Sequence, residues 1–358
     1  MTQPLSQSLI ETCAIGSDMA MSLYGAVALA CIRNHGQAKL ARVHYELGLA
    51  HQRRHFLDGI AKLNLDREAT DAIRSAKYHY LTNQLAGLNM EYIEETPTKV
   101  WIRYRAPYYT FDSQAAPGTG LAAIQSDVGA AVFKAWHGNS CTYLNNRRLV
   151  FVHTQNAADG DPWDAGYFTE SDEDVEPGDN YQRRPGEWGP AFNPSLAPKM
   201  PESWSSPERR AKSQRNFAID WLGSELITLA EVLGAPAAAE VTQHAYAVTL
   251  LQKHQSLAKR FGLPGIRSPR DAATFFARLL DSMGEDVAIA SDGDSVRVDQ
   301  TSSRLTRTLP PLPHEVENAI GYSWRPLLRL WNTSLDVHFR PRVQANGADV
   351  SWEFRDLR

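Results

Sequence analysis

The chain has 358 residues, enough for two or three hydrophobic cores at about 150 residues per domain, and its 43% hydrophobic and 22% charged content is typical of a globular protein. Its net charge of −4 provides no basic field, which argues against a nucleic-acid partner. The three cysteines, Cys13, Cys31 and Cys141, lie far apart without CxxC spacing, which argues against a disulfide framework or a cysteine zinc knuckle and suits a reducing cytoplasm.

The chain begins with helical patterns. Its longest apolar run, residues 19–32, is about half a bilayer span and lacks a basic segment before it, which predicts a buried helix. Helical periodicity continues over residues 37–62 and, after Asp66, to about Gly87. We therefore expect a cytoplasmic protein with no signal peptide and no membrane span.

A β-hairpin is predicted next. Two extended runs, residues 90–94 and 99–105, flank a turn at Thr96-Pro97-Thr98. Side chains alternate across a strand, so each face of the second run carries a different set. One face carries Trp101, Arg103 and Arg105, and the other carries Val100, Ile102 and Tyr104.

The face with the two arginines is a candidate site for a flat, anionic molecule, because guanidinium groups bind carboxylates and an aromatic ring offers a stacking surface. The alternative is that Arg103 and Arg105 lie on a solvated face and pair across the hairpin with one of three glutamates: Glu91, Glu94 or Glu95.

The rest of the first half continues with a helix and a hairpin. Residues 112–120 form a Gly/Pro-rich loop that is either a mobile lid or a connector. A helix is expected from Ser126 to about Tyr143. A second hairpin then follows over residues 148–154 and 163–169, with a turn at Asp159-Gly160.

From residue 170 the sequence becomes acidic and rich in proline, which predicts an irregular linker over residues 170–212. The first pattern then repeats, with helices at 216–233, 237–261 and 270–283, a hairpin at 287–299, a helix at 314–331 and a hairpin at 335–354. The sequence therefore predicts an α+β protein with an internal duplication. It would contain two tandem related units, residues 1–169 and 213–358, each an antiparallel sheet of two hairpins packed with helices.

This order of elements resembles that of the L-2-amino-thiazoline-4-carboxylic acid hydrolase-like proteins and of the related small-molecule-binding domain of the bacteriochlorophyll 4-vinyl reductase type. The local similarity lies in EYIEETPTKVWIRYRAP (residues 91–107) and FVHTQNAADGDPWDAGYF (residues 151–168). In the family these correspond to a strand that ends in Cys-Pro and to a late GDPxCDF-like hairpin. Here Ala106 replaces the cysteine and Asp164-Ala165 replaces the Cys-Asp pair. The resemblance implies this fold and a pocket for a small organic acid, without the family's thiol.

Candidate acid–base residues lie near the second hairpin. His137, close to a helix C-terminus, can titrate near neutrality, and with His153 and Asp164 it would form an acid–base set. Glu91 is a reserve member of this set. The alternative for His137 is a surface cap that interacts with the helix dipole.

No cofactor is predicted. The chain has no GxGxxG after a strand, no GxxxxGK[ST] and no GxSxG, which argues against a Rossmann cofactor, a P-loop nucleotide and an α/β-hydrolase. The alternative is a divalent metal ion such as zinc, held by the HxxxH pair His51 and His55 together with His79. Helical histidines are more often structural or solvent-facing.

Together these features predict a hydrolase or lyase-like enzyme that acts on a small aromatic or heterocyclic carboxylate by acid–base chemistry. Arg103 and Arg105 would bind the carboxylate, and three aromatic side chains would enclose the ring: Trp101, Tyr92 and Trp163. One alternative is that these strand aromatics belong to the core. Another is a non-catalytic small-molecule-binding or sensor protein. The second half has fewer functional side chains, and we expect it to support the first half or to form a homodimer.

Overall fold

The computed structural model describes residues 8–105, 124–176, 178–263, 265–292, 294–301, 303–344 and 347–358. The chain divides into two compact units. The first-sheet unit spans His35–Ser206, and the second-sheet unit contains the described residues up to Asn34 together with Pro207–Arg358. The first helix therefore groups with the second half, and the expected linker up to Ser206 groups with the first half, which differs from the expected boundaries at 169 and 212. Ala106 and the loop 112–120 lie outside the described residues.

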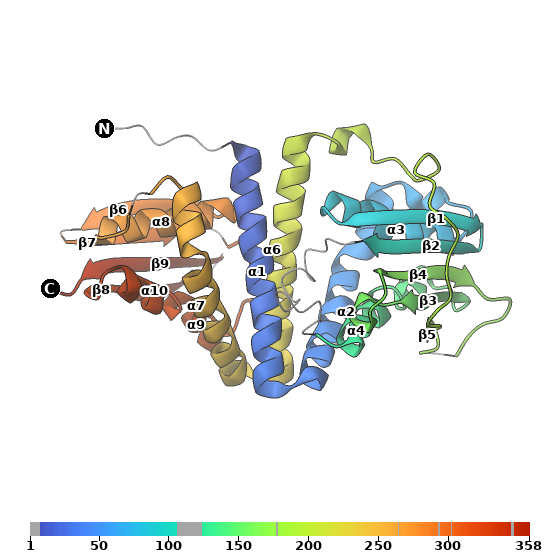
Figure 1. The fold of residues 1–358 in the computed structure, drawn as a ribbon, viewed down its shortest axis with the longest axis horizontal. Helices are drawn as coiled ribbons and strands as arrows, with labels where there is room; N and C mark the ends of the chain where they lie inside the picture. Colours follow the sequence, from blue (N-terminus) through green and yellow to red (C-terminus); the bar gives the residue numbers. More distant parts are fainter. Residues whose placement is uncertain are drawn as a thin grey trace. The chain divides into compact units, whose positions relative to one another are not determined.

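The first-sheet unit packs helices against one five-stranded sheet (Figure 1). Its helices are α2 (Gln37–Lys62), α3 (Asp71–Leu85), α4 (Ser126–Trp136) and α5 (Ser140–Leu144), with short 3-10 helices at Leu65–Arg67, Ala157–Asp159 and Glu202–Trp204. Its strands are β1 (Asn89–Thr96), β2 (Lys99–Arg105), β3 (Leu149–Gln155), β4 (Trp163–Glu170) and β5 (Tyr181–Arg183). The order is β1-β2-β4-β3-β5, antiparallel except for the parallel pair β3 and β5.

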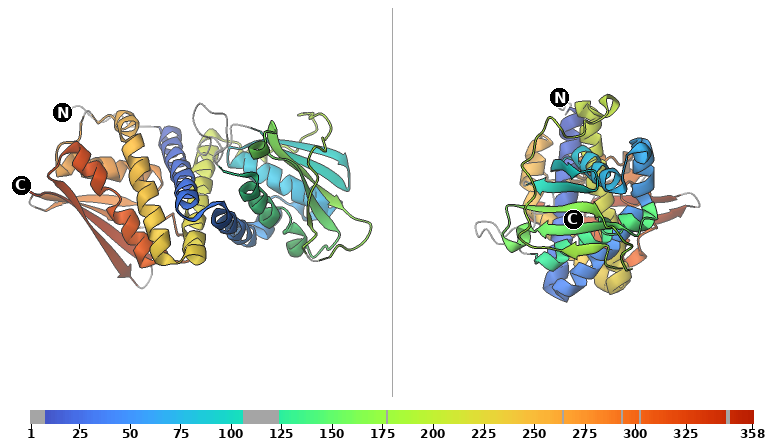
Figure 2. Two further views of the ribbon diagram at one scale, coloured as in Figure 1. Left: turned by 60° about the horizontal axis from the view of Figure 1, so that its bottom comes forward. Right: turned by 90° about the vertical axis from the view of Figure 1, so that its right-hand side faces the viewer.

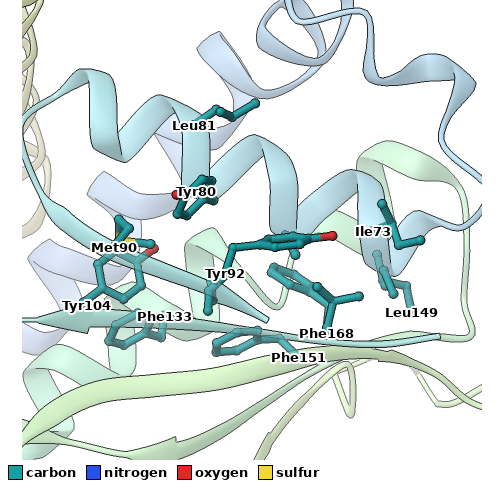
Figure 3. Close-up of a cluster of buried hydrophobic side chains, with 14 residues drawn as sticks. Ile73, Tyr80, Leu81, Met90, Tyr92, Tyr104, Phe133, Leu149, Phe151 and Phe168 are labelled. Atoms are coloured by element: carbon teal, nitrogen blue, oxygen red, sulfur yellow. The ribbon is translucent and has the colours of Figure 1, made fainter. Parts of the chain in front are cut away.

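The larger core of this unit lies between α3 and the sheet. The Thr70 side chain caps α3 by accepting a hydrogen bond from the amide of Ile73. The carboxylate of Glu170, at the end of β4, accepts hydrogen bonds from two other free amides of the first turn, those of Asp71 (2.7 Å) and Ala72 (3.1 Å). These bonds fix the helix on the strands, and alternate strand residues fill the space beneath it (Figure 3). The core includes Tyr80, Leu81, Tyr92, Val100, Ile102, Tyr104, Phe151 and Phe168.

The other face of the sheet is covered by the described residues between β4 and Pro207, which we call the covering segment. In Figure 1 this segment crosses the strands. Trp101 is 1% exposed and packs with Tyr167, and Phe192 of the covering segment joins the same cluster. A Cβ atom on Gly189 would lie only 2.6 Å from the Trp101 ring, so this close approach requires glycine. Residues expected to form an irregular linker are therefore the second cover of the first sheet.

The second-sheet unit packs six helices, counted over the described residues, with a four-stranded sheet (Figure 2). They are α1 (Leu9–His35), α6 (Pro207–Leu233), α7 (Ala235–Arg260), α8 (Pro269–Ser282), α9 (His314–Tyr322) and α10 (Arg325–Trp331). The strands are β6 (Val287–Asp292), β7 (Ser295–Gln300), β8 (Leu335–Gln344) and β9 (Gly347–Asp356), in the antiparallel order β6-β7-β9-β8. α8 begins with a capping box between Ser268 and Asp271, with proline after the cap.

The two halves of the chain share one series of elements. Three long helices come first, then a hairpin, two short helices and a second hairpin. The order β1-β2-β4-β3 in the first sheet corresponds to β6-β7-β9-β8 in the second. The predicted α+β class, with two related units that each contain an antiparallel sheet of two hairpins and packed helices, is confirmed.

Two helices differ from their expected limits. The helix expected from Ser126 to about Tyr143 is broken into α4 and α5, which places His137 at the C-terminus of α4. The helix expected at 216–233 starts nine residues earlier, at Pro207. A proline fits the first turn of a helix because the amide it lacks has no partner there.

Among the described helices, α1 alone has the length and apolar composition of a membrane span. Its most apolar window has a mean hydropathy of 1.5, and 72% of that window is buried inside the protein. Gly16 of α1 lies against the backbone of Ser282 in α8, so closely that a Cβ atom would overlap its carbonyl oxygen. The absence of a side chain at Gly16 allows α1 to pack directly against α8.

Candidate functional site

The two arginines of β2 both bind Glu91. Nη1 of Arg103 lies 3.0 Å from one carboxylate oxygen of Glu91, and Nη1 of Arg105 lies 2.8 Å from the other. Arg103 and Glu91 are cross-strand partners, and each side chain is 7% exposed. Arg103 also donates to the carbonyl oxygen of Pro190 in the covering segment (2.6 Å). Of the two interpretations, the pairing is therefore the observed one, although Arg103 and Glu91 are buried and only Arg105, 48% exposed, lies partly in solvent as that alternative supposed.

Trp163 completes this arrangement. It is the cross-strand partner of Arg105, and both guanidinium groups lie over its ring, at 5.3 Å for Arg103 and 5.4 Å for Arg105. Trp188 of the covering segment packs edge-on against Trp163. The guanidinium groups thus already have anionic, carbonyl and aromatic partners within the protein.

A second group of polar residues lies on the opposite, helix-facing side of the same sheet. Nε2 of His137 lies 2.8 Å from the hydroxyl of Tyr104, and the two side chains are 1% and 5% exposed. Asn83 of α3 joins them by donating from Nδ2 to the Tyr104 hydroxyl (3.2 Å). The break between α4 and α5 delivers His137, and the alternation of β2 delivers Tyr104.

Asn83 indicates the direction of the bond between Tyr104 and His137. Its Nδ2 also donates to the carbonyl oxygen of His79 (2.7 Å), and a carbonyl can only accept, so this side of the amide is the NH2 group. The Tyr104 hydroxyl accepts one of these hydrogens, which favours the arrangement in which it donates its own to Nε2 of His137. The remaining proton of the neutral imidazole then sits on Nδ1.

Two further imidazole rings adjoin this pair. His79, fully buried, stacks on His137 with ring centroids 4.2 Å apart and on Phe168 at 5.5 Å. His153 receives or donates a hydrogen bond at Nδ1, 2.8 Å from the hydroxyl of Tyr181. Within the described residues, both nitrogens of His79, Nδ1 of His137 and Nε2 of His153 are buried without a hydrogen-bond partner.

Burial keeps all three rings neutral. It lowers the pKa of His79 and His137 well below the usual value for histidine, and each is lowered further by a neighbouring imidazole. Burial likewise lowers the pKa of His153 to about 4. At neutral pH these side chains are therefore donors and acceptors of hydrogen bonds without net charge.

Asp164 is the titratable group of this side. It is the cross-strand partner of Tyr104, it is 2% exposed, and its Oδ1 accepts a hydrogen bond from the amide of Ala157 (2.9 Å). Burial raises the pKa of Asp164 to about 7, against the opposing effect of that hydrogen bond, and the charges of Asp161 and Asp159 raise it further. A carboxyl group with such a pKa exchanges protons readily at neutral pH.

The predicted site residues are thus divided between the two faces of the sheet. The register places Arg103, Arg105, Trp101, Trp163 and Glu91 on the covered face. It places Tyr92, His153 and Asp164 on the helix-facing side, where His137 of the α4 C-terminus contacts Tyr104. A molecule bound by the arginines would therefore be separated by the sheet from His137, and Tyr92 and Trp101 cannot enclose the same ring.

The histidines of the metal alternative lie on α2 and α3. The His51 and His55 rings pack with centroids 4.6 Å apart, as expected for neighbours one turn apart on a helix. His51 and His79 both pack edge-on against Trp136, at 5.7 and 4.9 Å. His79 contacts the ring of His137 directly, which associates it with the acid–base group.

Two members of the helix-facing group, Asn83 and Tyr181, were not among the sequence candidates. Alternation along β2 predicts that Tyr104 faces away from the arginines, so its side of the sheet could be predicted from the sequence. Nothing in the helical pattern of α3 distinguishes Asn83 as a functional residue. Tyr181 belongs to the segment expected to be a linker, and only its parallel pairing with β3 brings it to His153.

Comparisons with known proteins add no relative. No family model matches the chain, and no curated protein or solved structure matches it.

Proposed function

We propose that the protein is an enzyme that acts on a small aromatic or heterocyclic carboxylate by hydrolysis or a related proton-transfer reaction. Its site is the helix-facing side of the first sheet, and its working groups are Asp164, Tyr104, His137 and His153. The observation that carries the proposal is a carboxyl group with a pKa of about 7 beside a hydrogen-bonded tyrosine and histidine.

Asp164 takes the central role because it alone of these groups changes its protonation state near neutrality. In its protonated form it donates a hydrogen bond to the substrate carboxylate, and it then serves as the proton donor of the reaction. This replaces the carboxylate-binding role first assigned to Arg103 and Arg105, since both already bind Glu91.

Tyr104 and His137 act as a pair. Burial raises the pKa of Tyr104 well above its usual value and lowers that of His137, so the proton stays on the phenol and the imidazole accepts it as a hydrogen bond. His137 is therefore a positioning residue for the Tyr104 hydroxyl. His153 is held by Tyr181 in the same way.

The proposal is tested with a panel of aromatic and heterocyclic carboxylates, by following substrate loss and the melting temperature together. For any substrate turned over, Asp164→Asn should lower kcat by about 10²–10⁴-fold, because the amide retains the hydrogen bond but cannot release a proton. Tyr104→Phe should also lower kcat. Tyr80→Phe is the matched control, since Tyr80 is a buried tyrosine of the same core whose hydroxyl binds Gln84.

The pH profile separates the proposed role from a structural one. Because the protonated form of Asp164 binds the substrate carboxylate, kcat/KM should fall as the pH rises through about 7. A profile without this inflection, or equal turnover in the wild type and Asp164→Asn, would refute the proposal. Stabilisation by a carboxylate with no turnover would instead identify a non-catalytic binding or sensor protein, the alternative favoured by the neutrality of all three imidazoles.

A further inference from the structure

The second-sheet unit contains a cavity of about 120 Å³ between its sheet and its helices. Four aromatic side chains form much of its wall: Phe276, Trp324, Phe339 and Trp352. Phe276 meets Trp324 edge-to-face at 4.4 Å and Trp352 at 4.6 Å between ring centroids. Met19 and Leu23 of α1 also line the space, so the first helix of the chain contributes to it.

Strand register shows which part of the first sheet corresponds to this cavity. Ile102 is the fourth residue of β2 and Val298 the fourth of β7, and their cross-strand partners are Gly166 and Trp352. Two residues further along, the pair Tyr104–Asp164 of the first sheet corresponds to Gln300–Val350 of the second.

The outer strands follow the same correspondence. His153 pairs with Gly166, and Phe339 pairs with Trp352. Gln300, Val350, Phe339 and Trp352 all line the cavity. The cavity therefore occupies the place that Tyr104, Asp164 and His153 hold in the first-sheet unit, but the corresponding residues Gln300, Val350 and Phe339 are not ionisable.

The polar groups of the cavity wall include two carboxylates, those of Glu285 and Glu317. The carboxylate of Glu285 is used by the protein, since both of its oxygens lie 2.9 Å from the amide of Arg304. Glu317 on α9 also lines the cavity, and its carboxylate receives no hydrogen bond from any residue of the described chain. Burial raises the pKa of both glutamates, which are thus poorly solvated.

We infer that this cavity is a second binding site, for an uncharged single-ring aromatic compound that carries one hydrogen-bond donor such as a hydroxyl or amine group. The volume supports a single ring, because an apolar protein cavity of about 150 Å³ accommodates benzene. The edge-to-face aromatic wall favours a ring over an aliphatic chain. Glu317 accepts the hydrogen bond of the donor, and the loss of hydration in this largely apolar cavity disfavours an anionic carboxylate. The site is independent of the proposed enzymatic site in the first-sheet unit.

The test uses phenol as the probe and benzoate as the matched anion, with the full-length protein. At about ten times its dissociation constant, phenol should raise the melting temperature of the second-sheet unit by about 3–5 °C, and benzoate should leave it unchanged. Calorimetric titration should give one site per chain. The absence of a phenol effect, or an equal effect of benzoate, would overturn the inference.

Two substitutions of isoleucine by phenylalanine locate the site. Ile320→Phe fills the cavity, which Ile320 lines, and should abolish the phenol shift. Ile289→Phe adds the same atoms at a position of the second sheet that is 46% exposed, and the shift should persist. Ser303→Leu, at the cavity wall outside the helices, provides a second filling variant if Ile320→Phe does not fold.

Two further measurements separate this site from the first sheet. Crystals soaked in 4-iodophenol should show anomalous signal beside Phe276 and Trp352, and signal elsewhere alone would refute the assignment. Tyr104→Phe should bind phenol as the wild type does. A loss of phenol binding in Tyr104→Phe would place the ligand in the first-sheet unit and contradict the inference.

Discussion

The substitution Asp164→Asn removes a buried ionisable group from the helix-facing side of the first sheet while it keeps the side chain's shape. The asparagine oxygen can still accept the hydrogen bond that Oδ1 of Asp164 receives from the amide of Ala157. What changes is the cost of holding a negative charge in a site that is 2% exposed. We therefore predict that the variant is more stable than the wild type at neutral and higher pH.

The magnitude follows from the pKa. Burial raises the pKa of Asp164 from its ordinary value of 3.8 to about 7. Since one pKa unit is worth about 1.4 kcal/mol, ionised Asp164 costs the folded state up to about 4 kcal/mol. Between pH 4 and 7 the folded protein retains this proton while the unfolded chain has released it. The wild type therefore loses stability as the pH rises through this window, and the loss stops above pH 7.

Urea unfolding at pH 5, 6, 7 and 8 measures this effect by tryptophan fluorescence. The free-energy difference between Asp164→Asn and the wild type should grow by about 2–3 kcal/mol from pH 5 to 7 and stay constant above that. Asp58→Asn is the control, because Asp58 is an exposed aspartate on α2 of the same unit. A difference that is the same at pH 5 and pH 8 would show that the carboxyl group is not desolvated.

Two further predictions concern the packing of each unit. Glu91→Gln leaves Arg103 buried without its anion, so it should destabilise the first-sheet unit by about 3–5 kcal/mol in urea unfolding. The control, Glu94→Gln at an exposed position, should cost less than about 1 kcal/mol. Equal effects of the two substitutions would show that the pair of Arg103 and Glu91 is solvated. Gly16→Ala places a methyl group against the carbonyl oxygen of Ser282, so it should destabilise the second-sheet unit by about 1–3 kcal/mol in thermal melts, and an unchanged melting temperature would contradict the packing of α1 on α8.

The sequence by itself determined most of the elements and the faces of the first sheet. Turn residues and alternation depend on neighbouring positions only, so the hairpin around Thr96-Pro97-Thr98 and the common face of Trp101, Arg103 and Arg105 follow from local rules. The repeated order of helices and hairpins, and with it the α+β class, could be predicted for the same reason.

Only the tertiary structure decided what those faces meet. Three glutamates were equally available to the arginines from the sequence, and the selection of Glu91 depends on cross-strand register together with the covering segment that buries Arg103. The assignment of α1 to the second-sheet unit likewise rests on its contact with distant residues such as Ser282. Desolvation has the same character, because the pKa of Asp164 reflects everything packed around it, and no local pattern records how much water a fold excludes.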